Sequence, residues 1–152
     1  MKHSSRIRRF GLGILASMAL AACGGSTASS PAATAPPTPT PAPIVVTSSD
    51  ATHGTFLVAA SNSMTLYTFT HDTPGVSACS GQCLVVWPAL TVPAATSKVT
   101  GGPGITGTLA IITRSDGVHQ VSYNGLPLYF FDKDTAVGDV KGVYPSWVLA
   151  KP

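Results

Sequence analysis

Two cysteines with three residues between them, Cys79 and Cys83, are the side chains of this sequence best suited to chemistry. Outside the cytoplasm, two cysteines this close normally oxidise to a disulfide. Thiolates also bind soft metals, and copper carriers use a Cys-x-x-x-Cys pair together with a distant histidine. The first prediction is therefore a disulfide, and a metal or redox site is the alternative.

The alternative metal site has further candidate ligands. Met64 offers a thioether, and His71 and His119 offer imidazoles, all of which suit copper. A c-type haem is not expected, because no histidine directly follows Cys83. Neighbouring side chains on a strand point to opposite faces, so an exposed His71 is a simpler expectation than a catalytic pair with Asp72. We expect no bound cofactor.

A second group of residues recurs along the chain. Segment 66–73 (LYTFTHDT) matches segment 128–135 (LYFFDKDT) at an offset of 62, with identity at five of the eight positions. A tryptophan follows each tyrosine, 20 residues later in the first copy and 18 in the second. We interpret this as two diverged repeats, at about 54–90 and 108–150. The repeated motif residues are Tyr67, Phe69, Asp72, Tyr129, Phe131 and Asp134.

The repeated motif favours a structural role. On a strand, the tyrosine and the phenylalanine of each copy point to the same face, which predicts a core surface. The aspartate falls where the strand ends, so it can accept backbone N–H groups and fix the turn. A tyrosine of the other copy is a further candidate donor to it. The alternative is a ligand or metal site lined by both copies across a pseudo-twofold axis.

The N-terminal region has the pattern of an export signal. Basic residues precede an apolar run at 10–20, which is about half of the roughly 20 residues that a membrane span requires. The run ends in Leu20-Ala21-Ala22-Cys23, which resembles a bacterial lipobox. It predicts a signal peptide at 1–22 and a lipid on Cys23 that anchors the protein to a membrane. Gly24 in place of aspartate permits sorting to an outer membrane, if the organism has one.

Composition excludes several classes of function. The whole chain has a formal charge of +3, but the part after residue 22 has five basic and six acidic residues, a balance of −1. No basic patch remains for nucleic acid, so we expect no nucleic-acid partner. The sequence contains no glutamate and no recognisable hydrolase motif, so we expect that it is not an enzyme.

The organisation follows from composition. Residues 23–43 are rich in Pro, Thr and Ala and form a tether. Residues 44–152 are sufficient for one small domain. The β-branched and aromatic stretches 55–59, 64–70, 108–113, 118–123 and 128–131 predict strands, and Asp116-Gly117 and Asn124-Gly125 predict two-residue hairpin turns. We expect an all-β fold of two β-meander repeats, with two similar sheets around one core and no convincing helix.

Together, the two Tyr-x-Phe-x-x-Asp copies, the Cys79–Cys83 stretch and Trp87-Pro88 resemble the secreted-repeat lipoproteins with a Tyr-x-(Phe/Trp/Tyr)-x-x-Asp motif. The similarity extends over about residues 55–147. It implies an envelope location and a repeat, but no assigned activity and no catalytic residue.

From these observations we expect a membrane-anchored lipoprotein of the bacterial envelope, facing the periplasm or the exterior. Its role would be that of a binding or scaffold module for an unknown envelope protein or small ligand. The competing hypothesis is a metal-binding (copper) or electron-transfer protein of the envelope.

Overall fold

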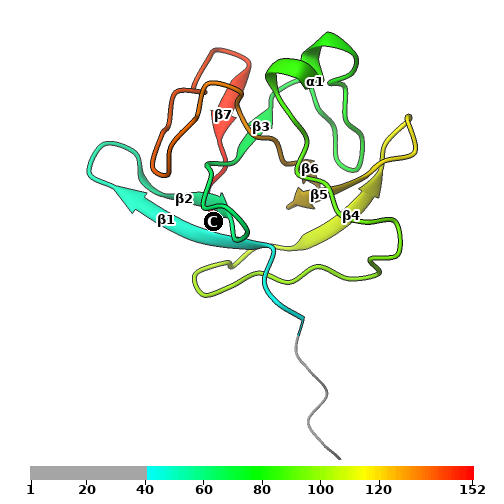
Figure 1. Ribbon diagram of the computed structural model, residues 1–152, viewed down its shortest axis with the longest axis horizontal. Helices are drawn as coiled ribbons and strands as arrows, with labels where there is room; N and C mark the ends of the chain where they lie inside the picture. The colour runs from blue at the N-terminus through cyan, green and yellow to red at the C-terminus, as the bar shows by residue number, and fades with distance from the viewer. Residues whose placement is uncertain (1–40) are drawn as a thin grey trace, which may run out of the picture. The chain divides into compact units, whose positions relative to one another are not determined.

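Each half of the described part of the chain begins with a β-hairpin (Figure 1). The computed structural model describes residues 41–152, which belong to one compact unit. The predicted signal peptide, the predicted lipidation site Cys23 and the predicted tether up to residue 40 lie outside the described residues. Its elements are β1 Val45–Asp50, β2 Gly54–Ala59, β3 Tyr67–Phe69, α1 Gln82–Val86, β4 Leu109–Thr113, β5 His119–Tyr123, β6 Leu126–Pro127 and β7 Trp147–Leu149.

These strands form three small antiparallel sheets, β1-β2, β3-β7 and β4-β5-β6. The all-β prediction is confirmed, but the expectation of two similar sheets is wrong. The second motif copy, at 128–131, contributes no strand and only two isolated bridges, which join Tyr129 to Tyr67 and to Ala89. Sequence patterns also missed β1, β7 and the five-residue helix α1. Within residues 41–152, no helix is long and apolar enough to cross a membrane.

Turn residues set the strand registers. Asn124 and Gly125 have φ of 49° and 86° and form the predicted two-residue turn, which pairs Tyr123 with Leu126. The other turn is longer than predicted. Its Arg114 and Val118 share a hydrogen bond of 2.9 Å across a three-residue loop, in which Gly117 has φ of 83°. The third loop position of such a hairpin requires a left-handed conformation, which glycine adopts without strain.

The two repeats exchange their C-terminal segments. In the first half, the N–H of Leu57 donates to the carbonyl of Ala150 at 2.8 Å, and the N–H of Ala150 donates to Leu66 at 2.9 Å. The N–H of Leu66 in turn donates to the carbonyl of Leu57 at 3.0 Å. Ala150 lies at the end of the second repeat, so the first hairpin is completed by residues from the other half.

The second half repeats this arrangement. The N–H of Val121 donates to Leu90 at 2.8 Å, that of Leu90 to Leu128 at 2.9 Å, and that of Leu128 to Val121 at 3.0 Å. Leu90 comes from the end of the first repeat. The matching bonds define a pseudo-twofold relation, and the exchange means that neither repeat is a complete meander alone.

The interior has an aliphatic part and an aromatic part. The aliphatic cluster combines both repeats, since Leu57 and Leu66 of the first pack with Val121 and Leu128 of the second, all at 0% exposure. Burial of side chains of this size stabilises a fold by about 1.5–3 kcal/mol each. The aromatic cluster contains Tyr67, Cys79, Trp87, Tyr129, Phe131 and Trp147.

The predicted disulfide is present. Cys79 and Cys83 are joined, with their Cα atoms 5.4 Å apart, and the bridge closes the loop that leads into α1. Cys79 is buried at 1% exposure and belongs to the aromatic cluster. The disulfide therefore fixes the loop and the helix against the core from one side.

Reduction of this disulfide should lower the free energy of unfolding by about 2 kcal/mol, because it releases a short loop in the unfolded chain. Urea unfolding with and without reductant measures the difference. The Cys79→Ser/Cys83→Ser double variant is the control and should not respond to reductant. An unchanged wild-type midpoint in reductant, with free thiols verified by mass, would contradict the prediction.

Candidate functional site

The two tyrosines of the motif meet on the pseudo-twofold axis. The N–H of Tyr67 donates to the carbonyl of Tyr129 at 2.8 Å, and the reverse bond measures 2.9 Å. Both side chains are fully buried, at 0% exposure. This pair places the two motif copies side by side and antiparallel, although 62 residues separate them in the sequence.

Each tyrosine hydroxyl donates a hydrogen bond to the motif aspartate of the other repeat. The Tyr67 hydroxyl donates to Oδ2 of Asp134 at 2.7 Å, and the Tyr129 hydroxyl donates to Oδ2 of Asp72 at 2.8 Å. The other oxygen of each carboxylate accepts a backbone N–H, from Ala78 to Asp72 at 2.7 Å and from Lys141 to Asp134 at 2.9 Å. Each aspartate thus fixes its own turn and ties that turn to the other repeat.

The electrostatics keep these phenols protonated. Burial raises the pKa of Tyr129 to about 12, and the neighbouring Asp72 adds to the effect. Burial, followed by the bond to Asp134, raises the pKa of Tyr67 well above its usual range. Burial also raises the pKa of Asp72, against the opposing hydrogen bonds from Ala78 and Tyr129. Both tyrosines are therefore hydrogen-bond donors at neutral pH.

A column of four stacked rings lies across the same axis. Trp87 and Trp147 are parallel within 4°, with ring centroids 3.8 Å apart. Phe131 stacks on Trp87 at 4.5 Å, and Phe69 stacks on Trp147 at 4.4 Å. Each indole is thereby covered on both faces, by the other indole on one side and by a phenylalanine on the other.

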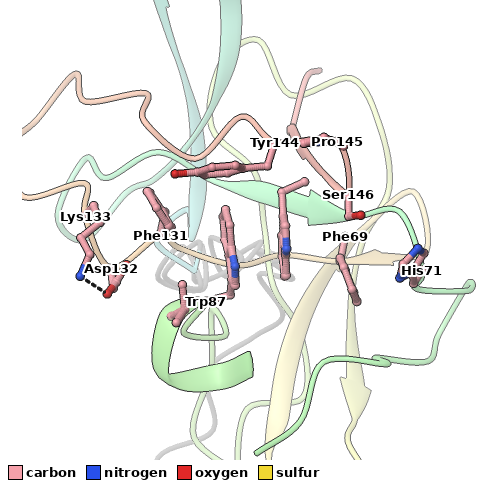
Figure 2. A pocket seen from close by; sticks show the side chains of 11 residues that line it. Phe69, His71, Trp87, Phe131, Asp132, Lys133, Tyr144, Pro145 and Ser146 are labelled. Atoms are coloured by element: carbon pink, nitrogen blue, oxygen red, sulfur yellow. Dashed lines mark hydrogen bonds and ion pairs between the residues drawn. The ribbon is translucent and has the colours of Figure 1, made fainter. Parts of the chain in front are cut away.

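The column lines an open groove of about 720 Å³ (Figure 2). Tyr144, which is 49% exposed, lies across the edges of Phe131 and Trp87, at centroid distances of 5.6 and 6.1 Å. The remaining lining residues are His71, Val86, Asp132, Lys133, Pro145 and Ser146. A ligand in this groove would meet ring edges, because the indole faces are already occupied.

Polar groups stand at the two ends of the groove (Figure 2). His71 contacts Phe69 edge-on at one end, with ring centroids 4.9 Å apart. At the other end, Nζ of Lys133 donates to Oδ2 of Asp132 at 2.7 Å. Oδ1 of Asp132 is buried and has no hydrogen-bond partner among residues 41–152. The groove is therefore almost neutral, and it has one carboxylate oxygen without a donor.

Both indole N–H groups are also without an acceptor in the part of the chain that the structure describes. Neither indole nitrogen is among the fully buried side-chain atoms without a partner there, which are Nδ1 of His119 and Oδ1 of Asp132. Both tryptophans line the groove, and each is 6% exposed.

The comparison with protein families gives two matches, at residues 47–91 and 110–150, to the family described as a secreted repeat of unknown function (Lipoprotein_15). The chain belongs to this family. No curated protein and no solved structure matches it. The two matches confirm the repeat and its resemblance, and they indicate a location outside the cytoplasm.

In this secreted repeat, the first match begins within β1, at residue 47, whereas the sequence placed the first repeat at about 54. The earlier start gives both repeats the same order of hairpin, motif and exchanged segment. β1 escaped detection because VVTSSD becomes polar after its first two residues and has no strict alternation.

The secreted repeat does not bring the predicted metal ligands together. Cys79 and Cys83 form a disulfide, so their sulfur atoms are not thiolates in this state. Residues 41–152 contain no group of three or more His, Cys, Asp or Glu side chains arranged to hold a metal ion. His71 is exposed and lines the groove, whereas His119 is partly buried in β5.

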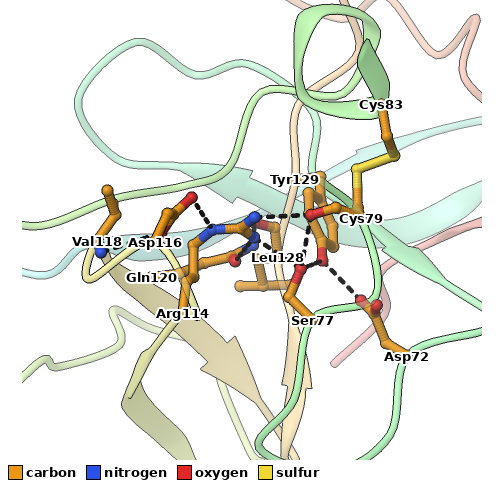
Figure 3. Close-up of polar contacts among 10 residues, drawn as sticks. All are labelled: Asp72, Ser77, Cys79, Cys83, Arg114, Asp116, Val118, Gln120, Leu128 and Tyr129. Atoms are coloured by element: carbon orange, nitrogen blue, oxygen red, sulfur yellow. Dashed lines mark hydrogen bonds and ion pairs between the residues drawn. A yellow bond between two sulfur atoms is a disulfide. The ribbon is translucent and has the colours of Figure 1, made fainter. Parts of the chain in front are cut away.

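Sequence patterns missed the buried Arg114 (Figure 3). Its guanidinium donates to the carbonyl of Cys79 at 2.7 Å, to Oγ of Ser77 at 2.6 Å and to Oε1 of Gln120 at 2.8 Å. It thereby links the disulfide loop of the first repeat to β5 of the second. The sequence did contain a signal for this role. Arg114 is the only arginine after residue 9, and arginine alone has a planar set of donors that can bind several acceptors at once.

Tyr67→Phe and Tyr129→Phe should each lower the free energy of unfolding by about 1–3 kcal/mol, because a buried carboxylate loses its phenol donor. Urea unfolding at neutral pH measures both losses. Tyr144→Phe is the matched control, since Tyr144 is half-exposed and its hydroxyl has no hydrogen bond within the described chain, so the loss of that hydroxyl should cost less than about 0.5 kcal/mol. The prediction is wrong if all three substitutions cost the same.

Proposed function

We propose that this secreted repeat is a lipid-anchored binding module of the bacterial envelope, and that the aromatic groove is its ligand site. The observation that supports the ligand site is an open apolar groove lined by Trp87 and Trp147, whose indole N–H groups have no acceptor among residues 41–152. Small-molecule and peptide sites are typically apolar hollows with a few unpaired polar groups. Groups that a fold leaves unpaired are the ones that a ligand can satisfy.

The covered ring faces restrict the kind of ligand. Aromatic rings have a negative face and a positive edge, and here the indole faces stack on one another and on two phenylalanines. A sugar ring that needs an open aromatic face would find none on Trp87 or Trp147. Ring edges with N–H groups instead favour hydrogen-bond acceptors, above all carbonyl oxygens attached to an apolar skeleton.

The proposal includes a lipid anchor on Cys23 and assigns no catalytic role to the groove. The sequence Leu20-Ala21-Ala22-Cys23 supports lipidation, and the disulfide fits an oxidising compartment. A tether of 20 residues after Cys23 would extend to roughly 60 Å. Asp72 and Asp134 accept hydrogen bonds from buried tyrosines and do not line the groove. Within the described chain, Asp132 is the only carboxylate that lines it.

The anchor is tested by Cys23→Ser. We expect the wild-type protein in the membrane fraction, labelled by palmitate, and the variant in the soluble fraction without label. The Cys79→Ser/Cys83→Ser variant is the control, because it keeps Cys23 and should remain in the membrane. Equal partition of the wild type and Cys23→Ser would overturn the proposed anchor.

Ligand binding in the groove can be measured on the two tryptophans that line it. The chain contains two tryptophans, so the two indole N–H signals of a nitrogen-15 spectrum come only from the groove. We expect N,N-dimethylacetamide and menadione, which carry carbonyl oxygens, to shift both signals, and glucose to shift neither. The amide of the exposed Val118, outside the groove, is the internal control. If none of the three compounds shifts the indole signals, the groove is not the binding site.

A further inference from the structure

The groove has the features of a surface that binds an extended, proline-rich chain. Its lining combines exposed Tyr144 and Val86 with two indole donors, and its ion pair of Lys133 and Asp132 leaves it almost neutral. A polyproline II helix makes no internal hydrogen bonds, so its carbonyl groups remain free for outside donors. Aromatic-lined grooves recognise such segments because the helix is already ordered before binding.

The chain itself contains a segment of this chemistry. Residues 31–40 read PAATAPPTPT, with four prolines, no charge and the spacing Pro36-x-x-Pro39. Proline rings supply apolar surface for the groove, and the carbonyl oxygens supply acceptors for Trp87 and Trp147. We propose that the aromatic groove binds residues 31–40 of a second copy of this chain. This inference rests on the proposed ligand site.

The structure indicates why the occupant comes from another copy. The chain enters the domain beside the loop at Thr100, where the hydroxyl of Thr100 donates to the carbonyl of Pro41 at 3.2 Å and the N–H of Ile44 donates to the carbonyl of Thr100 at 2.8 Å. In Figure 1 this entry point lies at the opposite end of the domain from β3, β7 and α1, whose ends line the groove.

The short distance along the chain keeps the Pro36-x-x-Pro39 part of the segment from the groove of its own copy. Pro36 is five residues from Pro41, and five residues span at most about 18 Å even when fully extended. A domain of this size has a radius of gyration of about 13 Å, so a path around it to the far end is longer than that. The segment of a neighbouring copy has no such restriction, and copies anchored on one membrane would be concentrated for the contact.

The first test is a titration of the unlipidated Cys23→Ser chain with a peptide of sequence PAATAPPTPT. We expect a saturable shift of both indole N–H signals. A peptide with its four prolines replaced by alanine should cause no shift. Trp87→Phe and Trp147→Phe keep a ring in the column but remove one donor each, so each should weaken peptide binding by about twofold to tenfold. Val118→Ala, at an exposed site outside the groove, should leave the affinity unchanged.

Each outcome of the titration has a separate meaning. No shift with the peptide, when dimethylacetamide or menadione does shift the signals, overturns this inference and leaves the proposed binding site standing. No shift with any of these compounds overturns both. Equal shifts with the alanine peptide would show that the groove does not recognise proline.

The second test concerns the source of the segment. Sedimentation of the Cys23→Ser chain should show association that increases with protein concentration. Replacement of Pro36, Pro37 and Pro39 by alanine in that chain should abolish the association without changing the thermal unfolding temperature. A chain that binds the peptide yet stays monomeric at the highest concentrations would overturn the assignment to a second copy.

Discussion

The reciprocal backbone pair between Tyr67 and Tyr129 is the contact on which the rest of the domain depends. It holds the two motif copies in antiparallel register, and this register lets each hydroxyl reach the aspartate of the other copy. A buried hydrogen bond to a carboxylate is worth more than one to a neutral acceptor, and its loss leaves a charge unsatisfied. Tyrosine and aspartate therefore form one structural unit, although they come from different repeats.

The exchange of C-terminal segments follows from this register. Once the motif copies are paired, the segment after each tryptophan lies next to the hairpin of the other repeat and completes it. The same exchange brings Trp87 and Trp147 face to face on the axis. The groove is thus a consequence of how two repeats share one core, and a single repeat would contain only half of it.

The pseudo-twofold relation is incomplete where the groove is built. On the side of the first repeat the groove is bordered by the disulfide loop and α1, whereas on the side of the second repeat it is bordered by the Tyr144-Pro145 turn. At the two ends of the groove, His71 occupies the position that Lys133 has in the other copy. These differences make the two ends of the groove chemically distinct, so a bound chain would have a preferred direction.

The sequence by itself determined the all-β class, the repeat, the disulfide and the turn at Asn124-Gly125, because each rests on local chemistry or on spacing. Only the tertiary structure decided the three sheets, the exchanged segments, the column of Trp87 and Trp147 and the buried contacts of Arg114. Those features depend on residues up to 93 positions apart, such as Leu57 and Ala150, and periodicity within a short window cannot register such contacts. The indole N–H groups without an acceptor among residues 41–152 belong to the second group, since hydrogen-bond pairing is a property of the packed molecule.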